Sequence, residues 1–228
     1  MKNTLLLFTL LFSSFLFSQN VFWYDVILEV DSKDAATVAG LVDNYYSNHK
    51  KGADVTVKFS SIPLKGSSEK ATHIISITSE SSKSLADFRN SLSGSDWDLY
   101  LSKMSNYVKN SRASAGKDLY SVGTDNSNPI GQAWVFKVEN SNLNSFVGAF
   151  SKLIKSINFD GSVGVGQIIH GAENGVNTYI YGTYSDLNSA FNFGPKNDLE
   201  AKAFSEFSES IKGSVFTQTN TRVLIKTY

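Results

Sequence analysis

The most informative absence in this sequence is cysteine, which occurs nowhere among the 228 residues. Without thiols the chain cannot form a disulfide, offer a thiolate nucleophile or bind a metal through sulfur. No cysteine follows the apolar N-terminal run, which also excludes acylation of the bacterial lipoprotein type. A chain without disulfides depends on packing alone, so we expect a fold with a sizeable shared core.

An excess of either charge is also missing. The 21 Lys and Arg residues balance 21 Asp and Glu residues, and the basic side chains form no cluster. Proteins that bind nucleic acid concentrate basic side chains on one surface to neutralise phosphates. The sequence therefore predicts no nucleic-acid partner. The hydrophobic fraction of 41% and the charged fraction of 18% are those of an ordinary globular protein.

Motifs of known chemistry are scarce. No G-x-S-x-G nucleophile elbow occurs, and there are only three histidines. His49 ends a predicted helix beside two lysines, where a cation would suit the helix dipole. His73 and His170 lie at strand ends without further ligands at a recognisable spacing. The sequence therefore predicts no metal site and no catalytic residue.

The N-terminus has the pattern of a secretory signal peptide. Lys2 precedes an apolar run over residues 5–17, and Ser18 and Gln19 follow it. Thirteen residues are too few for an ordinary transmembrane helix. We expect residues 1–19 to be removed, leaving a secreted or periplasmic protein with no stable membrane insertion. A buried N-terminal strand or an uncleaved anchor is the alternative.

The remaining sequence contains one pattern twice. Each copy begins with a segment in which apolar and polar residues alternate, as in a strand. A segment with apolar residues at helical spacing follows, and then two strands, a broken helix and a last strand. We assign the first copy to residues 20–122, the linker to 123–130 and the second copy to 131–228. The first copy predicts strands at 23–30, 55–62, 72–78 and 118–122, and helical segments at 38–46, 84–92 and 97–108. The second copy predicts strands at 133–139, 163–169, 177–183 and 222–227, and helical segments at 143–157 and 186–211.

This β-α-β-β-α-β order predicts an α+β fold built from two tandem ferredoxin-like repeats. Each repeat would have a four-stranded antiparallel sheet with helices on one face. The other face is too apolar to be simple solvent surface. We therefore expect the two repeats to pack sheet to sheet as a pseudo-dimeric α/β barrel.

The pattern resembles the dimeric α/β-barrel superfamily over residues 22–228. The resemblance rests on the repeated element order, the broken second helix and the aromatic residues after each break, which are Trp97, Tyr100, Phe204 and Phe207. Members include antibiotic-biosynthesis-type monooxygenases, stress-responsive A/B-barrel proteins and haem proteins related to chlorite dismutase. The resemblance implies a small ligand between sheet and helices or inside the barrel. It implies no haem here, because the haem-binding members carry their proximal histidine on a helix that corresponds to residues 186–211, where no histidine occurs.

The alternation of the first strands predicts a polar site inside the barrel. If Tyr24, Val26 and Leu28 face the helices, the residues between them face inward. These side chains could equally lie at strand ends or form a structural ion pair. The glycines between Gly161 and Gly166 run into a strand, so we expect them to make room for a close neighbour rather than to bind a phosphate. The candidate ligand-binding residues are Trp23, Asp25, Lys137, Glu139, His170, Tyr179 and Tyr181.

The first functional expectation is an exported, non-catalytic protein that binds a small apolar or aromatic ligand or a protein partner. One alternative is a cofactor-independent monooxygenase-like enzyme, by analogy with the superfamily. Another is a structural protein of an envelope or secreted matrix. No cofactor is predicted, and the sequence leaves monomer and dimer open.

Overall fold

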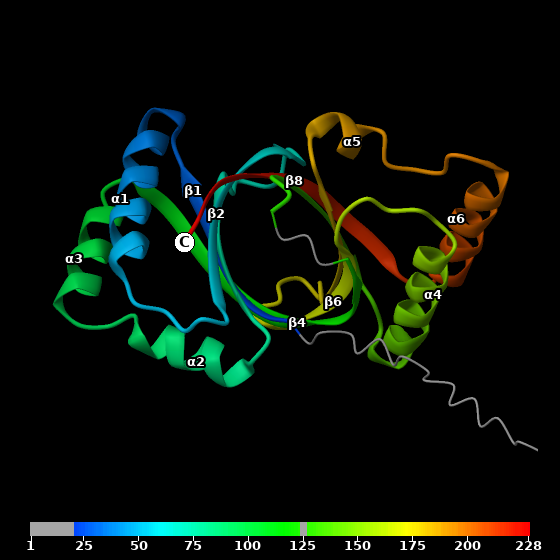
Figure 1. Ribbon diagram of the computed structural model, residues 1–228, viewed down its shortest axis with the longest axis horizontal. Helices are drawn as coiled ribbons and strands as arrows, with labels where there is room; N and C mark the ends of the chain where they lie inside the picture. Colours follow the sequence, from blue (N-terminus) through cyan, green and yellow to red (C-terminus); the bar gives the residue numbers. More distant parts are fainter. Residues whose placement is uncertain (1–20, 124–126) are drawn as a thin grey trace, which may run out of the picture.

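Eight antiparallel strands form a closed barrel with helices on two opposite sides (Figure 1). The computed structural model describes residues 21–123 and 127–228, so the predicted signal peptide at 1–19 lies outside the described residues. The first half contains β1 (Phe22–Val30), α1 (Ala35–Asn48), β2 (Val55–Lys65), β3 (His73–Ser79), α2 (Ser82–Ser91), α3 (Ser95–Met104) and β4 (Val108–Val122). The second half contains β5 (Ile130–Lys137), α4 (Leu143–Lys155), β6 (Val163–His170), β7 (Thr178–Tyr184), α5 (Leu187–Phe191), α6 (Asp198–Ser210) and β8 (Val215–Thr227).

The strand order shows how the two halves combine. Around the barrel it is β1-β3-β2-β8-β5-β7-β6-β4, so each half supplies four adjacent strands. The halves join along two seams, where β2 pairs with β8 and β4 pairs with β6. The expected barrel is present, and its two halves are also hydrogen-bonded edge to edge. Each sheet would otherwise expose two unpaired edges, and closure removes those edges while turning both open faces toward one interior.

The strands at the seams are longer than the sequence predicts. β4 begins at Val108 rather than at residue 118, and β8 begins at Val215 rather than at residue 222. The predicted helix over 97–108 ends at Met104. Each long strand pairs with two neighbours, β4 with β1 and β6, and β8 with β5 and β2. Pairing with β1 therefore extends β4 back to Val108, and pairing with β5 extends β8 back to Val215, beyond the segments that the sequence predicts.

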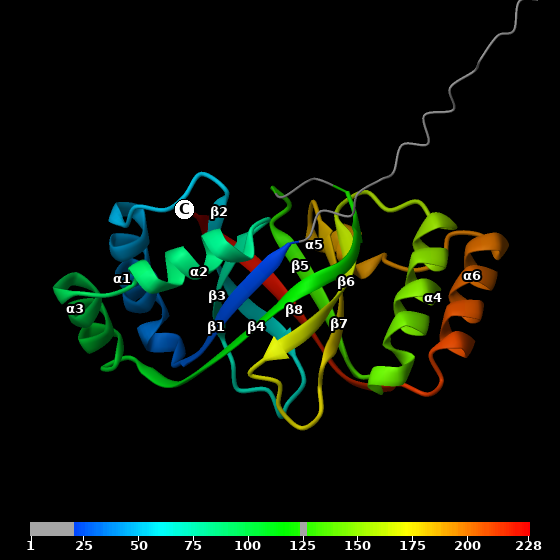
Figure 2. The same cartoon turned by 90° about the horizontal axis from the view of Figure 1, so that it is seen from below.

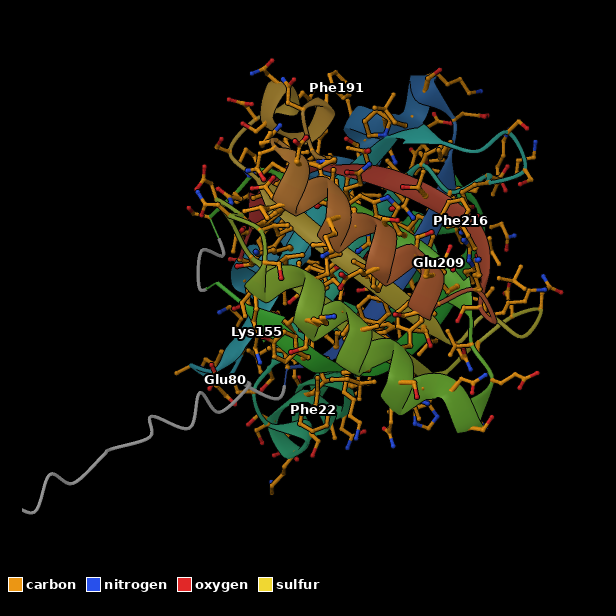
Figure 3. The ribbon with its side chains drawn as sticks, turned by 90° about the vertical axis from the view of Figure 1, so that its right-hand side faces the viewer. Phe22, Glu80, Lys155, Phe191, Glu209 and Phe216 are labelled. Atoms are coloured by element: carbon orange, nitrogen blue, oxygen red, sulfur yellow. The ribbon has the colours of Figure 1, made fainter. Side chains whose placement is uncertain are left out.

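The helices cover the outer face of the barrel and form two apolar cores. In the first half, Val38 and Val42 of α1 pack with Phe59 of β2. In the second half, Phe146 and Phe150 of α4 belong to the equivalent cluster. Helices α4 and α6 pack side by side over the second-half strands, as Figure 3 shows. The predicted helical stripes are confirmed, because these apolar positions face the sheet in both halves.

The second helix of each half is broken, as predicted. Gly94 separates α2 from α3 with a φ of 85°, a conformation that glycine adopts without the penalty of a side chain. Asp186 caps α5 and Asn197 caps α6 through side-chain oxygens that accept backbone N–H groups. Within the described parts of the chain, none of the helices has both the length and the apolar character needed to cross a membrane.

Candidate functional site

The interior of the barrel contains a hydrogen-bonded network around Asp118. Asp118 of β4 accepts hydrogen bonds from the hydroxyls of Tyr179 (2.7 Å) and Tyr181 (2.9 Å) on β7. The indole Nε1 of Trp23 on β1 donates to the Tyr179 hydroxyl at 2.5 Å. We call these four residues the tyrosine–aspartate network. Three of its members were predicted to share the interior, and Asp118 is the partner that connects the two tyrosines.

The network places an acid in a poorly solvated position. Asp118 is 5% exposed. Burial raises the pKa of its carboxyl group, although the hydrogen bonds from Tyr179 and Tyr181 act in the opposite direction. Burial and the neighbouring Asp118 also raise the pKa of both tyrosine hydroxyls, so these remain protonated donors. The arrangement therefore holds two phenolic protons directly against one carboxyl group.

Two glycines of β6 create the space for the tyrosine rings. A Cβ atom on Gly164 would lie 2.5 Å from the Tyr181 ring, and one on Gly166 would lie 2.1 Å from the Tyr179 hydroxyl. The residues on either side of Gly164 face the second-half core and leave the glycines on the interior face. The expectation that this glycine run makes room for a close neighbour agrees with these contacts.

Asp25 lies in the same interior but has a different partner. Its Oδ2 atom is 3.5 Å from the Nη1 atom of Arg222 on β8. Burial raises the pKa of Asp25, while Arg222 and the Ser76 hydroxyl counteract that rise. Since Asp25 belongs to the first half and Arg222 to the second, this ion pair connects the two halves across the barrel.

The other three predicted site residues do not reach the network. Lys137 is the last residue of β5, Glu139 follows that strand, and His170 is the last residue of β6. All three side chains are exposed. Their positions agree with the alternative that these groups lie at strand ends. Alternation predicts the face of a strand but not how far along the barrel a side chain lies.

The histidines have structural surroundings. The ring of His49 stacks on Tyr45 with centroids 5.2 Å apart, and its Nε2 atom lies 2.8 Å from the Ser91 hydroxyl. Burial lowers the pKa of His49, which disfavours the cationic role expected at the end of α1. His73 is buried and stacks on Phe59.

A pocket of about 140 Å³ opens at one end of the barrel, where the end of β1 meets the β2–β3 loop and the start of β4. We call it the mouth pocket. Ile27 and Ala71 supply apolar surface, and charged and uncharged polar residues supply the rest of the wall. The register pairs Glu29 with Asn110 and Ile27 with Arg112, so Glu29 and Arg112 are diagonal neighbours on the interior face.

The two glutamates of the mouth pocket differ in their partners. Glu69 accepts hydrogen bonds from the Ala71 amide (2.8 Å) and from Nη2 of Arg112 (2.7 Å). Burial tends to raise the pKa of Glu69, but these hydrogen bonds outweigh it and lower that pKa. Glu29 is half-buried, and no hydrogen bond or close ion pair of its carboxylate is found among the described residues, although its charge acts on Lys109. In the mouth pocket, the Arg112 guanidinium is therefore ion-paired with Glu69, whereas the Glu29 carboxylate has no such pair among the described residues.

Sequence reasoning missed the residues that complete these sites. Arg112 lies in a segment that was not predicted as a strand, and Asp118 and Arg222 lie at the first positions of predicted strands. The signal that could have found Asp118 is its inward position beside a glycine-rich strand that accommodates two tyrosines. Arg112 carries no such signal.

The described residues do not fit a haem or metal centre. The space between the second-half strands and α4 and α6 is filled by apolar side chains such as Phe146, Phe150 and Phe207. No histidine lies on α5 or α6 to serve as an axial ligand. Within residues 21–123 and 127–228, no three histidine, aspartate or glutamate side chains come close enough together to hold a metal ion.

Comparison with known proteins supports the fold rather than a family. No protein-family model and no curated protein matches the sequence. A monooxygenase-like protein of Fusobacterium nucleatum has a similar structure, with a TM-score of 0.64 and 13% identity over 92% of this chain and 94% of that one. An anthrone oxidase-like protein gives a TM-score of 0.63 and 11% identity over 92% and 93% of the two chains. A chlorite dismutase variant of Candidatus Nitrospira defluvii gives 0.52 and 10% identity over 90% and 92%.

These likenesses show the fold alone, a mixed α+β architecture with a closed antiparallel barrel. They also correct the first functional expectation. The proteins that share this barrel over nine-tenths of the chain are named for oxygenase, oxidase or dismutase activities, which favours the enzyme alternative over a non-catalytic protein.

Proposed function

We propose that this chain is a monooxygenase-like enzyme that uses O₂ to oxidise a small phenolic or enolisable molecule in the mouth pocket. The observation that carries the proposal is the half-buried carboxylate of Glu29, which lines the mouth pocket together with Arg112. The likeness to monooxygenase-like and oxidase-like proteins supports the class of reaction, while the residues support the site.

The size of the mouth pocket suits one small ring. An engineered apolar cavity of about 150 Å³ in another protein admits benzene. The mouth pocket has a similar volume of about 140 Å³, but its wall includes Glu29, Glu69 and Arg112. A substrate with an apolar ring and at least one oxygen atom would match this lining.

The chemistry needs a base and an anion-stabilising group. Glu29 would remove a proton from an acidic C–H or O–H bond, and Arg112 would stabilise the oxyanion that forms. The electron-rich anion then donates one electron to O₂, and the resulting radical pair combines to a peroxide. Loss of water from that peroxide converts a CH₂ group into a carbonyl group, so one oxygen atom enters the product and the other leaves as water.

The Glu29→Gln variant tests this proposal. We expect it to lower substrate-dependent O₂ consumption by about 10²-fold or more, because a positioned general base contributes about 10²–10⁴-fold to rates. The measurement uses an oxygen electrode and a panel of single-ring phenols and cyclic β-diketones. Glu80→Gln is the matched control, since Glu80 is an exposed glutamate outside the mouth pocket. An unchanged rate in Glu29→Gln, or no O₂ consumption with any member of the panel, would refute the proposal.

We also propose that the two halves are ferredoxin-like repeats, at residues 20–122 and 131–228, joined by a linker at 123–130. The element order supports this, because β4-β1-β3-β2 in the first half corresponds to β8-β5-β7-β6 in the second. Because few residues are identical between the copies, the repeat is visible in the order and spacing of the strands and helices rather than in residue identity.

Export through the signal peptide remains part of the proposal. Expression of the whole chain in a bacterium should yield a periplasmic or secreted protein that begins near residue 20. The intact mass of the purified protein measures this directly. A cytosolic product that keeps residues 1–19 would contradict it.

A further inference from the structure

We propose that the tyrosine–aspartate network is a redox-active site in which Tyr179 gives one electron to an oxidant while its phenolic proton moves to Asp118. In the cell the oxidant would be the substrate radical formed in the mouth pocket, and in this respect the inference rests on the proposed function. The redox chemistry of the network itself needs only a one-electron oxidant.

Hydrogen bonding around the Tyr179 hydroxyl suits this step. A phenol that loses an electron becomes a strong acid, so its oxidation is easiest when a proton acceptor is already in contact. The Tyr179 hydroxyl donates to Oδ1 of Asp118 at 2.7 Å and accepts from Nε1 of Trp23 at 2.5 Å. Asp118 can therefore accept the phenolic proton, and the Tyr179 oxygen still accepts a hydrogen bond from Trp23 after that proton has left.

The step balances within these residues. The O–H bond of Tyr179 breaks, its proton forms a bond to the carboxylate of Asp118, and one electron passes to the oxidant. The products are a neutral phenoxyl radical and a neutral carboxylic acid, so no unpaired charge is left in the interior. Tyr181 continues to donate to the other oxygen of Asp118, which lies 2.9 Å from its hydroxyl. Reduction of the radical reverses the transfer.

Ring contacts link the network to the strand that enters the mouth pocket. The Trp23 and Tyr179 rings meet edge to face with centroids 5.5 Å apart, and the Tyr179 and Tyr181 centroids are 6.2 Å apart. Ile27 of the mouth pocket lies on the same strand face as Trp23, four residues away, or about 13 Å along the strand. An oxidising equivalent from the mouth pocket would therefore meet Trp23 first and Tyr179 next.

This arrangement distinguishes these tyrosines from the others in the described part of the chain. Tyr179 and Tyr181 alone donate to a carboxylate. Tyr184 donates to the amide oxygen of Gln132, which is a much weaker base. Tyr45 and Tyr100 stack on each other without an acid as hydrogen-bond acceptor. Gly166 also packs against the Tyr179 hydroxyl, since a Cβ atom there would lie 2.1 Å from it.

Flash-quench oxidation of the whole chain tests the inference. Photo-oxidised tris(bipyridine)ruthenium serves as the oxidant, and transient absorption and electron paramagnetic resonance detect the phenoxyl radical. We expect a long-lived radical in the native protein and loss of most of its signal in Tyr179→Phe. Tyr184→Phe is the matched control and should keep the full signal. A native protein without a phenoxyl radical, or an undiminished signal in Tyr179→Phe, would overturn the proposal.

A second measurement on the native protein does not depend on any variant folding. If the proton moves to Asp118 with the electron, the radical forms more slowly in D₂O than in H₂O, and equal rates in the two solvents would overturn the proposal. Because light generates the oxidant, these outcomes are separate from the proposed function. A radical without substrate-dependent O₂ consumption would remove the oxygenase proposal and leave the redox site in place.

Discussion

Replacement of Gly116 by alanine is expected to destabilise the protein by about 3 kcal/mol or more, because overpacking against fixed backbone has no cheap relief. Gly116 is buried in β4 at the seam with β6. A Cβ atom there would lie 2.0 Å from the carbonyl oxygen of Gln167 and 2.6 Å from the Trp23 ring. The first contact forces β4 and β6 apart, and the second displaces the indole that donates to Tyr179.

Urea unfolding followed by circular dichroism measures this loss. Gly131→Ala is the matched control, since Gly131 is also a strand glycine, and the nearest atom to its added Cβ would be 3.9 Å away, on Arg222. We expect that control to stay within about 1 kcal/mol of the native protein. A Gly116→Ala variant as stable as Gly131→Ala would show that the seam is not closely packed at this position.

Replacement of Arg222 by methionine is expected to cost about 3 kcal/mol of folding free energy at neutral pH. Removal of one partner leaves the other charge buried without compensation, which typically costs 3–5 kcal/mol. Asp25 is 8% exposed, while the Arg222 side chain is 31% exposed, so we expect the lower end of that range. The lost pair also connects β1 of one half to β8 of the other.

The cost should depend on pH in a defined direction. Burial holds the pKa of Asp25 above its ordinary value in the folded protein, so the folded state binds this proton more tightly than the unfolded chain does. The contribution of Asp25 to the free energy of unfolding is therefore largest at low pH, and it is lost as pH rises toward the pKa of the folded state. Arg222→Met raises the folded pKa further, and the deficit should be small near about pH 4 and largest near about pH 8.

Unfolding at both pH values separates charge from packing. The Asp25→Asn/Arg222→Met double variant buries no charge at this position, so it should recover much of the loss and show a flatter pH profile. A deficit of Arg222→Met that is equal at both pH values would mean that the arginine acts through the packing of its stem rather than through its charge.

The local sequence determined the element types and the faces they present. The stripe through Val38, Val42 and Tyr46 repeats with the period of a helix, and those residues are buried in α1. The alternation from Trp23 to Glu29 has the period of a strand, and it correctly separates helix-facing from interior residues. Such periods survive in a single sequence because each follows from the geometry of one element and needs no distant partner.

Tertiary pairing decided where the barrel closes and which groups meet inside it. Residues 109–117 are small or polar and carry no clear alternation, yet they form most of β4 because they pair with β1, and from Ala115 onward also with β6. Asp118 meets Tyr179 across 61 positions of the chain, because the β4–β6 seam pairs Asp118 with Gly166 and β6 pairs Gly166 with Tyr179. The sequence by itself determined the two sets of elements and their inward faces. Only the tertiary structure decided the seams, the tyrosine–aspartate network and the mouth pocket, because register between distant strands leaves no periodic trace in either of them.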